Sequence, residues 1–150
     1  MFGIPGKKLV KISQKGDCIE EEVEVALADV KVVLFYFSCH WYQLCRNFTS
    51  KLKEAYENFR TVSKDVEVIY VSSENCQDVK KDLSEDIHGS WYSAVNDSGL
   101  CQYLETIYSV RGLPKLVAVR SDGSIINLNA RNEVKSKAER YFQELCNNNF

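Results

Sequence analysis

The run from Val30 to Phe37, with the segment that follows it, constrains the fold of this chain more than any other feature. The run is apolar except for Lys31. Its length and its Val, Phe and Tyr content favour a central strand that is covered on both faces of a sheet. From Tyr42 to Phe59 the apolar residues recur every third or fourth position, which predicts an amphipathic helix. A second apolar run, Val66 to Val71, closes a strand-helix-strand unit, whose connection we expect to be right-handed and parallel.

The rest of the chain predicts strands and helices that complete an α/β sandwich around this unit. Trp91 and Tyr92 fall in a loop, with Trp91 expected in the core, and the turn at Asp122-Gly123 predicts a hairpin. The order of elements predicts a central mixed β-sheet flanked by helices on both faces. The further strands are expected at Leu9–Ser13, Ile19–Ala28, Leu116–Arg120 and Ile125–Ala130, and the further helices at Cys76–Glu85, Leu100–Tyr108 and Glu133–Cys146.

Length and composition favour a single domain over residues 1–150. A chain of 150 residues with 45% hydrophobic content can bury one core and is short for two. Its net charge of -2 gives no electrostatic case for nucleic acid. No apolar run approaches the roughly 18 residues that span a bilayer, and residues 1–8 lack the apolar stretch of a signal peptide. We therefore expect a cytoplasmic protein that is not bound to a membrane, and the oligomeric state stays open.

The six cysteines show no framework spacing. In a chain without a secretion signal this pattern favours mostly reduced thiols. A zinc site needs paired ligands, and Cys39, His40 and Cys45 have no matching pair elsewhere. We expect neither a metal site nor a cofactor.

Two motifs carry the most specific information. The first runs from Phe35 to Arg46 and holds Trp41, Tyr42 and Cys45 where the predicted strand enters the predicted helix. The second is Leu113-Pro114, where a proline precedes an apolar strand. A proline is tolerated at the first residue of a strand, and the bond before proline is the one where the cis form is common.

With these motifs the chain resembles the tryparedoxin and nucleoredoxin branch of the thioredoxin superfamily, and within it nucleoredoxin-like proteins of the rod-derived cone viability factor type. The resemblance covers roughly residues 9 to 142 and implies a thioredoxin-like fold, with a cis proline at Pro114 beside the redox turn. The family pattern at that turn is Trp-Cys-Pro-Pro-Cys. The matching segments are Phe35-Tyr36-Phe37-Ser38, Cys45-Arg46-Asn47-Phe48-Thr49, Val71-Ser72-Ser73-Glu74, His88-Gly89-Ser90-Trp91, Leu113-Pro114-Lys115-Leu116-Val117 and Asp122-Gly123.

Against this pattern, Tyr42 stands in the place of the first redox cysteine. A thiol at a helix N-terminus has a depressed pKa and attacks disulfides as the thiolate. A phenol, with an ordinary pKa near 10, forms no mixed disulfide. Only Cys45 then matches a redox cysteine, as a reactive monothiol or as a buried small residue. Cys39 is a possible substitute partner for it, if the two Cα atoms come within about 7 Å.

These residues suggest three alternative functions. The first is a thiol-disulfide redox protein that uses Cys45, with or without Cys39. The second is a binding module that holds a protein or peptide partner on the surface of Trp41, Tyr42, Leu113 and Pro114, in which Tyr42 is an aromatic anchor or a position released from catalysis. The third, a glutathione or iron-sulfur carrier, needs a cysteine at position 42 and is rejected. We expect the chain to act as a binding module, although its lineage is that of thiol-disulfide redox proteins.

Overall fold

The computed structural model describes residues 2–4, 8–12, 18–39, 42–72, 90–94 and 97–147. In this part of the chain seven strands form one mixed sheet in the order β2-β1-β5-β4-β3-β6-β7. The strands are β1 (Lys8–Ile12), β2 (Cys18–Glu22), β3 (Val32–Ser38), β4 (Val66–Ser72), β5 (Tyr92–Ser93), β6 (Lys115–Arg120) and β7 (Ile125–Asn127). The helices are α1 (Val23–Ala26), α2 (Gln43–Arg60), α4 (Ser98–Ile107), α5 (Ala130–Lys137) and α6 (Glu139–Asn147).

The predicted strand-helix-strand unit is present. Strand β3 pairs in parallel with β4, and α2 connects them. On its other side β3 pairs antiparallel with β6, so it is a central strand. All seven of its residues are buried, as the uninterrupted apolar run predicted. The α/β class and the mixed sheet are therefore confirmed.

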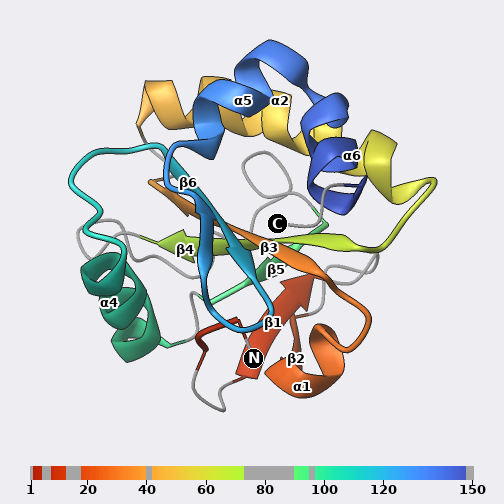
Figure 1. The fold of residues 1–150 in the computed structure, drawn as a ribbon. Coiled ribbons are helices and arrows are strands. Elements are labelled where there is room, and N and C mark those ends of the chain that lie inside the picture. The colour runs from red at the N-terminus through yellow and green to blue at the C-terminus, as the bar shows by residue number, and fades with distance from the viewer. Residues whose placement is uncertain are drawn as a thin grey trace.

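Helices cover both faces of the sheet (Figure 1). Helices α2, α5 and α6 lie on one face, and α1 and α4 lie on the other. The side chains of β3 alternate between the two cores, since Leu34 and Tyr36 pack under α2 while Val33 and Phe35 pack toward α1 and α4. Strand β3 therefore contributes side chains to both cores, and α2 begins shortly after its end.

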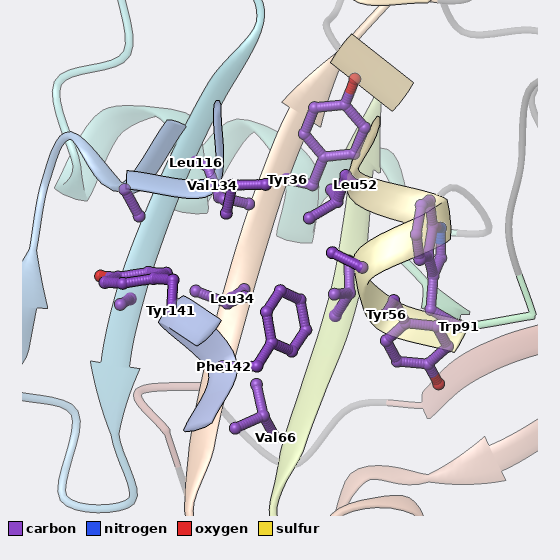
Figure 2. Packing of buried hydrophobic residues seen from close by; sticks show 14 of the residues in the cluster. Leu34, Tyr36, Leu52, Tyr56, Val66, Trp91, Leu116, Val134, Tyr141 and Phe142 are labelled. Atoms are coloured by element: carbon purple, nitrogen blue, oxygen red, sulfur yellow. The ribbon is translucent and has the colours of Figure 1, made fainter. Parts of the chain in front are cut away.

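Aromatic rings fill the core beneath α2 (Figure 2). The Trp91 side chain is fully buried, with its ring centroid 5.5 Å from Tyr56 and 6.2 Å from Tyr36. The Tyr36 ring also meets Phe48 of α2 at 5.6 Å, edge to face. Trp91 is thus a core residue, as predicted. Its neighbour Tyr92 departs from the predicted loop, because Tyr92–Ser93 forms the short strand that joins β1 to β4.

The prediction of a strand over Ile19–Ala28 is wrong in its second half. Strand β2 ends at Glu22, and α1 begins at Val23. Val23 and Leu27 are both buried in the core on the face of the sheet that α1 and α4 cover. A spacing of four residues places two side chains on one face of a helix, so burial of this pair favours the helical turn over continued alternation.

The C-terminal region is also more divided than predicted. Strand β7 ends at Asn127, whose side-chain oxygen accepts a hydrogen bond from the Asn129 backbone N–H at 2.7 Å and forms a turn. The single helix predicted over Glu133–Cys146 is two helices, because Ala138 has φ of 51° and interrupts the helical path. The helix predicted at Cys76–Glu85 lies outside the described residues.

Candidate functional site

The N-terminal end of α2 lies where β3 delivers the chain, at the position predicted for the redox turn. Helix α2 begins at Gln43, and Tyr42 is its N-cap residue with φ of -86° and ψ of 121°. The Tyr42 backbone N–H donates to the Cys39 carbonyl oxygen at 3.1 Å, and the Arg46 N–H donates to the Tyr42 carbonyl oxygen at 3.1 Å. The Tyr42 side chain does not cap the helix. The helix terminus that would activate a thiol thus carries a half-buried phenol.

Cys45 lies beneath this turn, and its thiol is not accessible. The residue is 1% exposed and its thiol is free. Cys39 is equally buried and packs in the same small cluster, which the half-buried side chains of Tyr42 and Leu113 cover. Two of the four predicted binding-surface residues, Tyr42 and Leu113, therefore cover the side chain of the candidate redox residue Cys45.

The suggested disulfide between Cys39 and Cys45 is absent. Cys39 is disulfide-bonded, and its partner is none of Cys45, Cys101 and Cys146, which are free. Among the described residues the expectation of mostly reduced thiols agrees with these three, and Cys39 is an exception to it. Cys39 directly follows β3 and makes its bond with another cysteine, whereas the Cys45 thiol packs inside the cluster under Tyr42.

Hydroxyl groups fix the first turn of α2 to the sheet. The Thr49 hydroxyl donates to the Cys45 main-chain oxygen at 2.8 Å. The Tyr36 hydroxyl lies 2.5 Å from the Thr49 oxygen and 3.1 Å from the same Cys45 oxygen. Burial raises the pKa of Tyr36 far above its ordinary value, so this phenol stays neutral. This network holds the backbone of Cys45 in place, and neither of its hydroxyl groups is a base that could deprotonate the Cys45 thiol.

Pro114 completes the candidate site from a distant part of the sequence. The Leu113–Pro114 peptide bond is cis, and Pro114 is buried directly before β6. One guanidinium nitrogen of Arg131, on α5, donates to the Pro114 carbonyl oxygen at 3.0 Å. This bond ties α5 to the segment beside the redox turn. Arg131 was not singled out from the sequence, where nothing marks a helical arginine as a partner of that carbonyl.

Two hollows adjoin Pro114. Their volumes are about 270 and 280 Å³, and Pro114 and Arg131 line both of them. The first is also lined by Lys115 of β6. The second runs along α2 and α5, where Leu44 and Phe48 supply apolar surface. Its cationic side chains are Lys51, Arg131 and Lys135.

The structure thus brings together Cys39, Tyr42, Cys45, Leu113 and Pro114. Trp41, His40 and His88 lie outside the described residues. Within the described ranges no group of three or more His, Cys, Asp or Glu side chains is placed to hold a metal ion. None of the helices in those ranges combines the length and the apolar character needed to cross a membrane.

Comparison with known proteins agrees with this geometry. Residues 29–125 match the model of a thioredoxin-like family. Thioredoxin-related protein 16 of Carcinoscorpius rotundicauda is 36% identical, with a TM-score of 0.76 over 95% of this chain and 96% of that one. Tryparedoxin I of Crithidia fasciculata is 29% identical, with a TM-score of 0.73 over 91% of this chain and 88% of that one.

Nucleoredoxins are similar over a shorter stretch. Bovine (Bos taurus) nucleoredoxin is 29% identical over 100 residues, which are 66% of this chain and 22% of nucleoredoxin. The match therefore spans between 20% and 30% of the length of these curated nucleoredoxins. The similarity therefore concerns only a part of those longer proteins.

Proposed function

The chain belongs to the thioredoxin-like family, in its nucleoredoxin and tryparedoxin branch, and we propose that it acts there as a binding module with weak or absent thiol-disulfide oxidoreductase activity. Its partner is an extended segment of a protein or peptide, held where the redox turn meets Pro114. The observation that carries this proposal is the cluster in which Tyr42 and Leu113 cover the buried Cys45.

The chemistry of position 42 argues against ordinary turnover. Disulfide reduction begins with attack by a thiolate and passes through a mixed disulfide. Tyr42 supplies neither, and Cys45 lies below the surface that a protein disulfide can approach. Attack by Cys45 on an external disulfide would require Tyr42 and Leu113 to move aside first. Exchange with a protein substrate is therefore expected to be slow.

The same surface is suited to binding. Tyr42 combines a large apolar ring with a hydroxyl, a combination that is enriched at energetically important points of interfaces. Leu113 lies beside it, and the Arg131 bond fixes the backbone at Pro114. A fixed backbone next to exposed apolar surface favours an extended segment, because main-chain hydrogen bonds and alternate side chains can then be used together.

The test compares two single substitutions in two assays. Wild type is expected to show no turnover in insulin reduction with dithiothreitol, and to bind members of an immobilised peptide array. Tyr42→Ala should lose peptide binding, whereas Cys45→Ser should keep it, because the Cys45 sulfur does not reach the surface. Turnover in wild type that disappears in Cys45→Ser would contradict the proposal.

A second function is favoured by one observation. The disulfide of Cys39 and the free thiol of Cys45 lie in one cluster. Attack of the Cys45 thiolate on the Cys39 sulfur would form a Cys39–Cys45 bond and release the thiolate of the former partner, with no net oxidation. Peptide mapping after incubation with glutathione would detect that bond, and its accumulation would favour a residual redox role.

We infer a cytoplasmic location, as the sequence suggested; the thiols of Cys45, Cys101 and Cys146 are free, as in a reducing compartment, whereas Cys39 is disulfide-bonded. Fractionation of cells that express the tagged chain tests this inference. Recovery of the chain from the secretory pathway would contradict it.

A further inference from the structure

We propose that the groove formed by the two hollows at Pro114 binds an acidic peptide segment that carries an apolar side chain between carboxylates. This inference rests on the proposed function, and it names the chemistry of the partner. It follows from charges that the fold gathers at one place although they are far apart in the sequence.

The two hollows adjoin at Pro114 and Arg131, which line both, and together they form the groove named here. One wall is α2, where Leu44, Phe48 and Lys51 line the groove at spacings of three and four residues. The other wall is α5, where Arg131 and Lys135 lie one turn apart. Helices α2 and α5 are in contact and lie side by side on one face of the sheet (Figure 1).

The charge of this groove is of one sign. Its cations are Lys51, Lys115, Arg131 and Lys135, and the described residues that line the hollows include no Asp or Glu. The Lys115 ammonium meets only a side-chain amide oxygen, 3.2 Å away, and Arg131 meets a backbone carbonyl. The chain as a whole has a net charge of -2, so this cluster opposes the average charge of the molecule.

One lysine of the same region, Lys137, is neutralised, which sets the four cations of the groove apart from it. Lys137, two residues after Lys135 on α5, contacts the carboxylates of Glu133 and Glu144 at 2.9 and 3.0 Å. No ion pair joins Lys51, Lys115, Arg131 or Lys135 to a described carboxylate. Like charges one turn apart, as at positions 131 and 135, repel each other. A bound carboxylate would relieve that repulsion.

The apolar part of the groove sets the rest of the preference. The Leu44 side chain is 56% exposed, which is high for a leucine on the apolar edge of a helix. It adjoins Phe48 and Pro114, so an apolar side chain can be buried there between the cations. Each hollow is smaller than the roughly 300 Å³ at which small-molecule sites begin. An extended chain that places one side chain in each hollow fits this shape.

A nucleic acid fits less well. Single strands are held by exposed aromatic rings on which bases stack. Among the described residues that line the hollows, Phe48 alone is aromatic, and it is 2% exposed. Carboxylates of a peptide are therefore the favoured anions.

The test measures fluorescence anisotropy with three labelled synthetic peptides of equal length. The first has two glutamates on each side of a central Leu-Leu pair, the second has glutamine in place of glutamate, and the third has lysine. The acidic peptide should bind about tenfold more tightly than the glutamine peptide at low salt, and this advantage should shrink as salt rises. The lysine peptide should bind more weakly than both.

Charge reversal locates the binding. Lys51→Glu with Lys135→Glu should remove the preference for the acidic peptide and leave the affinity for the glutamine peptide unchanged. Lys64→Glu, a reversal at an exposed residue outside the groove, is the matched control and should keep most of the preference.

The outcomes separate this inference from the proposed function. Binding of all three peptides with equal affinity, lost in Tyr42→Ala, would overturn the acidic preference and leave the binding module intact. Binding of none of them would overturn both. Tighter binding of labelled oligo-dT than of the acidic peptide would also overturn the inference, in favour of a nucleic acid.

Discussion

Replacement of Arg60 by methionine should destabilise the fold by removing the charge partner of a buried carboxylate. Glu67 lies on β4, and its side chain is 2% exposed. One of its oxygens accepts hydrogen bonds from the Tyr56 hydroxyl at 2.7 Å and from the Val68 backbone N–H at 2.9 Å. The other oxygen meets the Arg60 guanidinium at 3.3 Å. The pair ties the last turn of α2 to the sheet.

The size of the expected stability loss follows from the burial of Glu67 and Arg60. Removal of one partner of a buried ion pair costs about 3 to 5 kcal/mol, because the other charge is left uncompensated. Arg60 is 23% exposed, so part of its charge is already screened by water and the lower half of that range applies. Arg60 also lies over the Tyr56 ring, 5.5 Å from its centroid, a contact that is lost as well. We expect Arg60→Met to lower the free energy of unfolding by about 3 kcal/mol at pH 8.

The loss should depend on pH in one direction. Desolvation raises the pKa of Glu67 in the folded state, and Arg60 is the strongest opposing influence. Without Arg60 that pKa rises further. A carboxyl with a raised folded-state pKa contributes stability below its unfolded pKa, about 4.3, and loses it as pH rises through the folded value. Arg60→Met should therefore be closest to wild type at acid pH and furthest from it at pH 8.

Urea unfolding at several pH values, followed by tryptophan fluorescence, measures this effect, since Trp91 packs against Tyr56. Lys31→Met is the matched control. Lys31 and Asp65 form an exposed pair at 3.6 Å, and loss of such a pair should change stability by less than about 1 kcal/mol. An Arg60→Met protein that is as stable as the Lys31→Met control at pH 8, or whose loss is equal at all pH values, would refute the reasoning.

Three further predictions concern the candidate site and its supports. Tyr42→Cys should create turnover in insulin reduction, because the new thiol would sit at the N-cap of α2, where thiol pKa values fall to roughly 3.5 to 7.5; an inert variant would show that Gln43 and Leu44, which stand where the family pattern has prolines, matter as well. In native wild type, iodoacetamide should label Cys45 far more slowly than Cys146, which is half-buried, and equal rates would contradict the cover of Tyr42 and Leu113. Asp97→Ala should cost about 1 kcal/mol in thermal unfolding, because Asp97 caps α4 by accepting the Leu100 N–H at 3.0 Å.

Local pattern was enough to predict the elements that hold the site. The apolar run of β3 and the helical period of α2 each extend over many residues, so no tertiary contact had to be known. Prediction failed where a tertiary contact decides between two local patterns. The turn at Val23 became helical because Leu27 is buried beside it, and the long C-terminal helix divides at Ala138, which lets α6 place Phe142 against Phe59.

The candidate site was predictable in its position and unpredictable in its electrostatics. Tyr42 was recognisable because it departs from the family motif, and Pro114 was recognisable because it matches one. The cations of the groove come from α2, β6 and α5, and each is unremarkable in its own segment. Which lysines find a carboxylate, as Lys137 does, and which do not is decided by packing that a sequence does not display.

The tyrosine at position 42 decides which property of the helix start matters. A helix N-terminus carries a partial positive charge and backbone N–H groups without helical partners. With a thiol there, that field would stabilise a thiolate. With Tyr42 there, α2 has no side-chain cap and no acidic residue in its first turn, so the field is left uncompensated by the helix itself. The same field and the cations along Lys51 and Arg131 attract a carboxylate. Preference for an acidic partner can therefore arise from the helix N-terminus and these cations together, with no thiol at position 42.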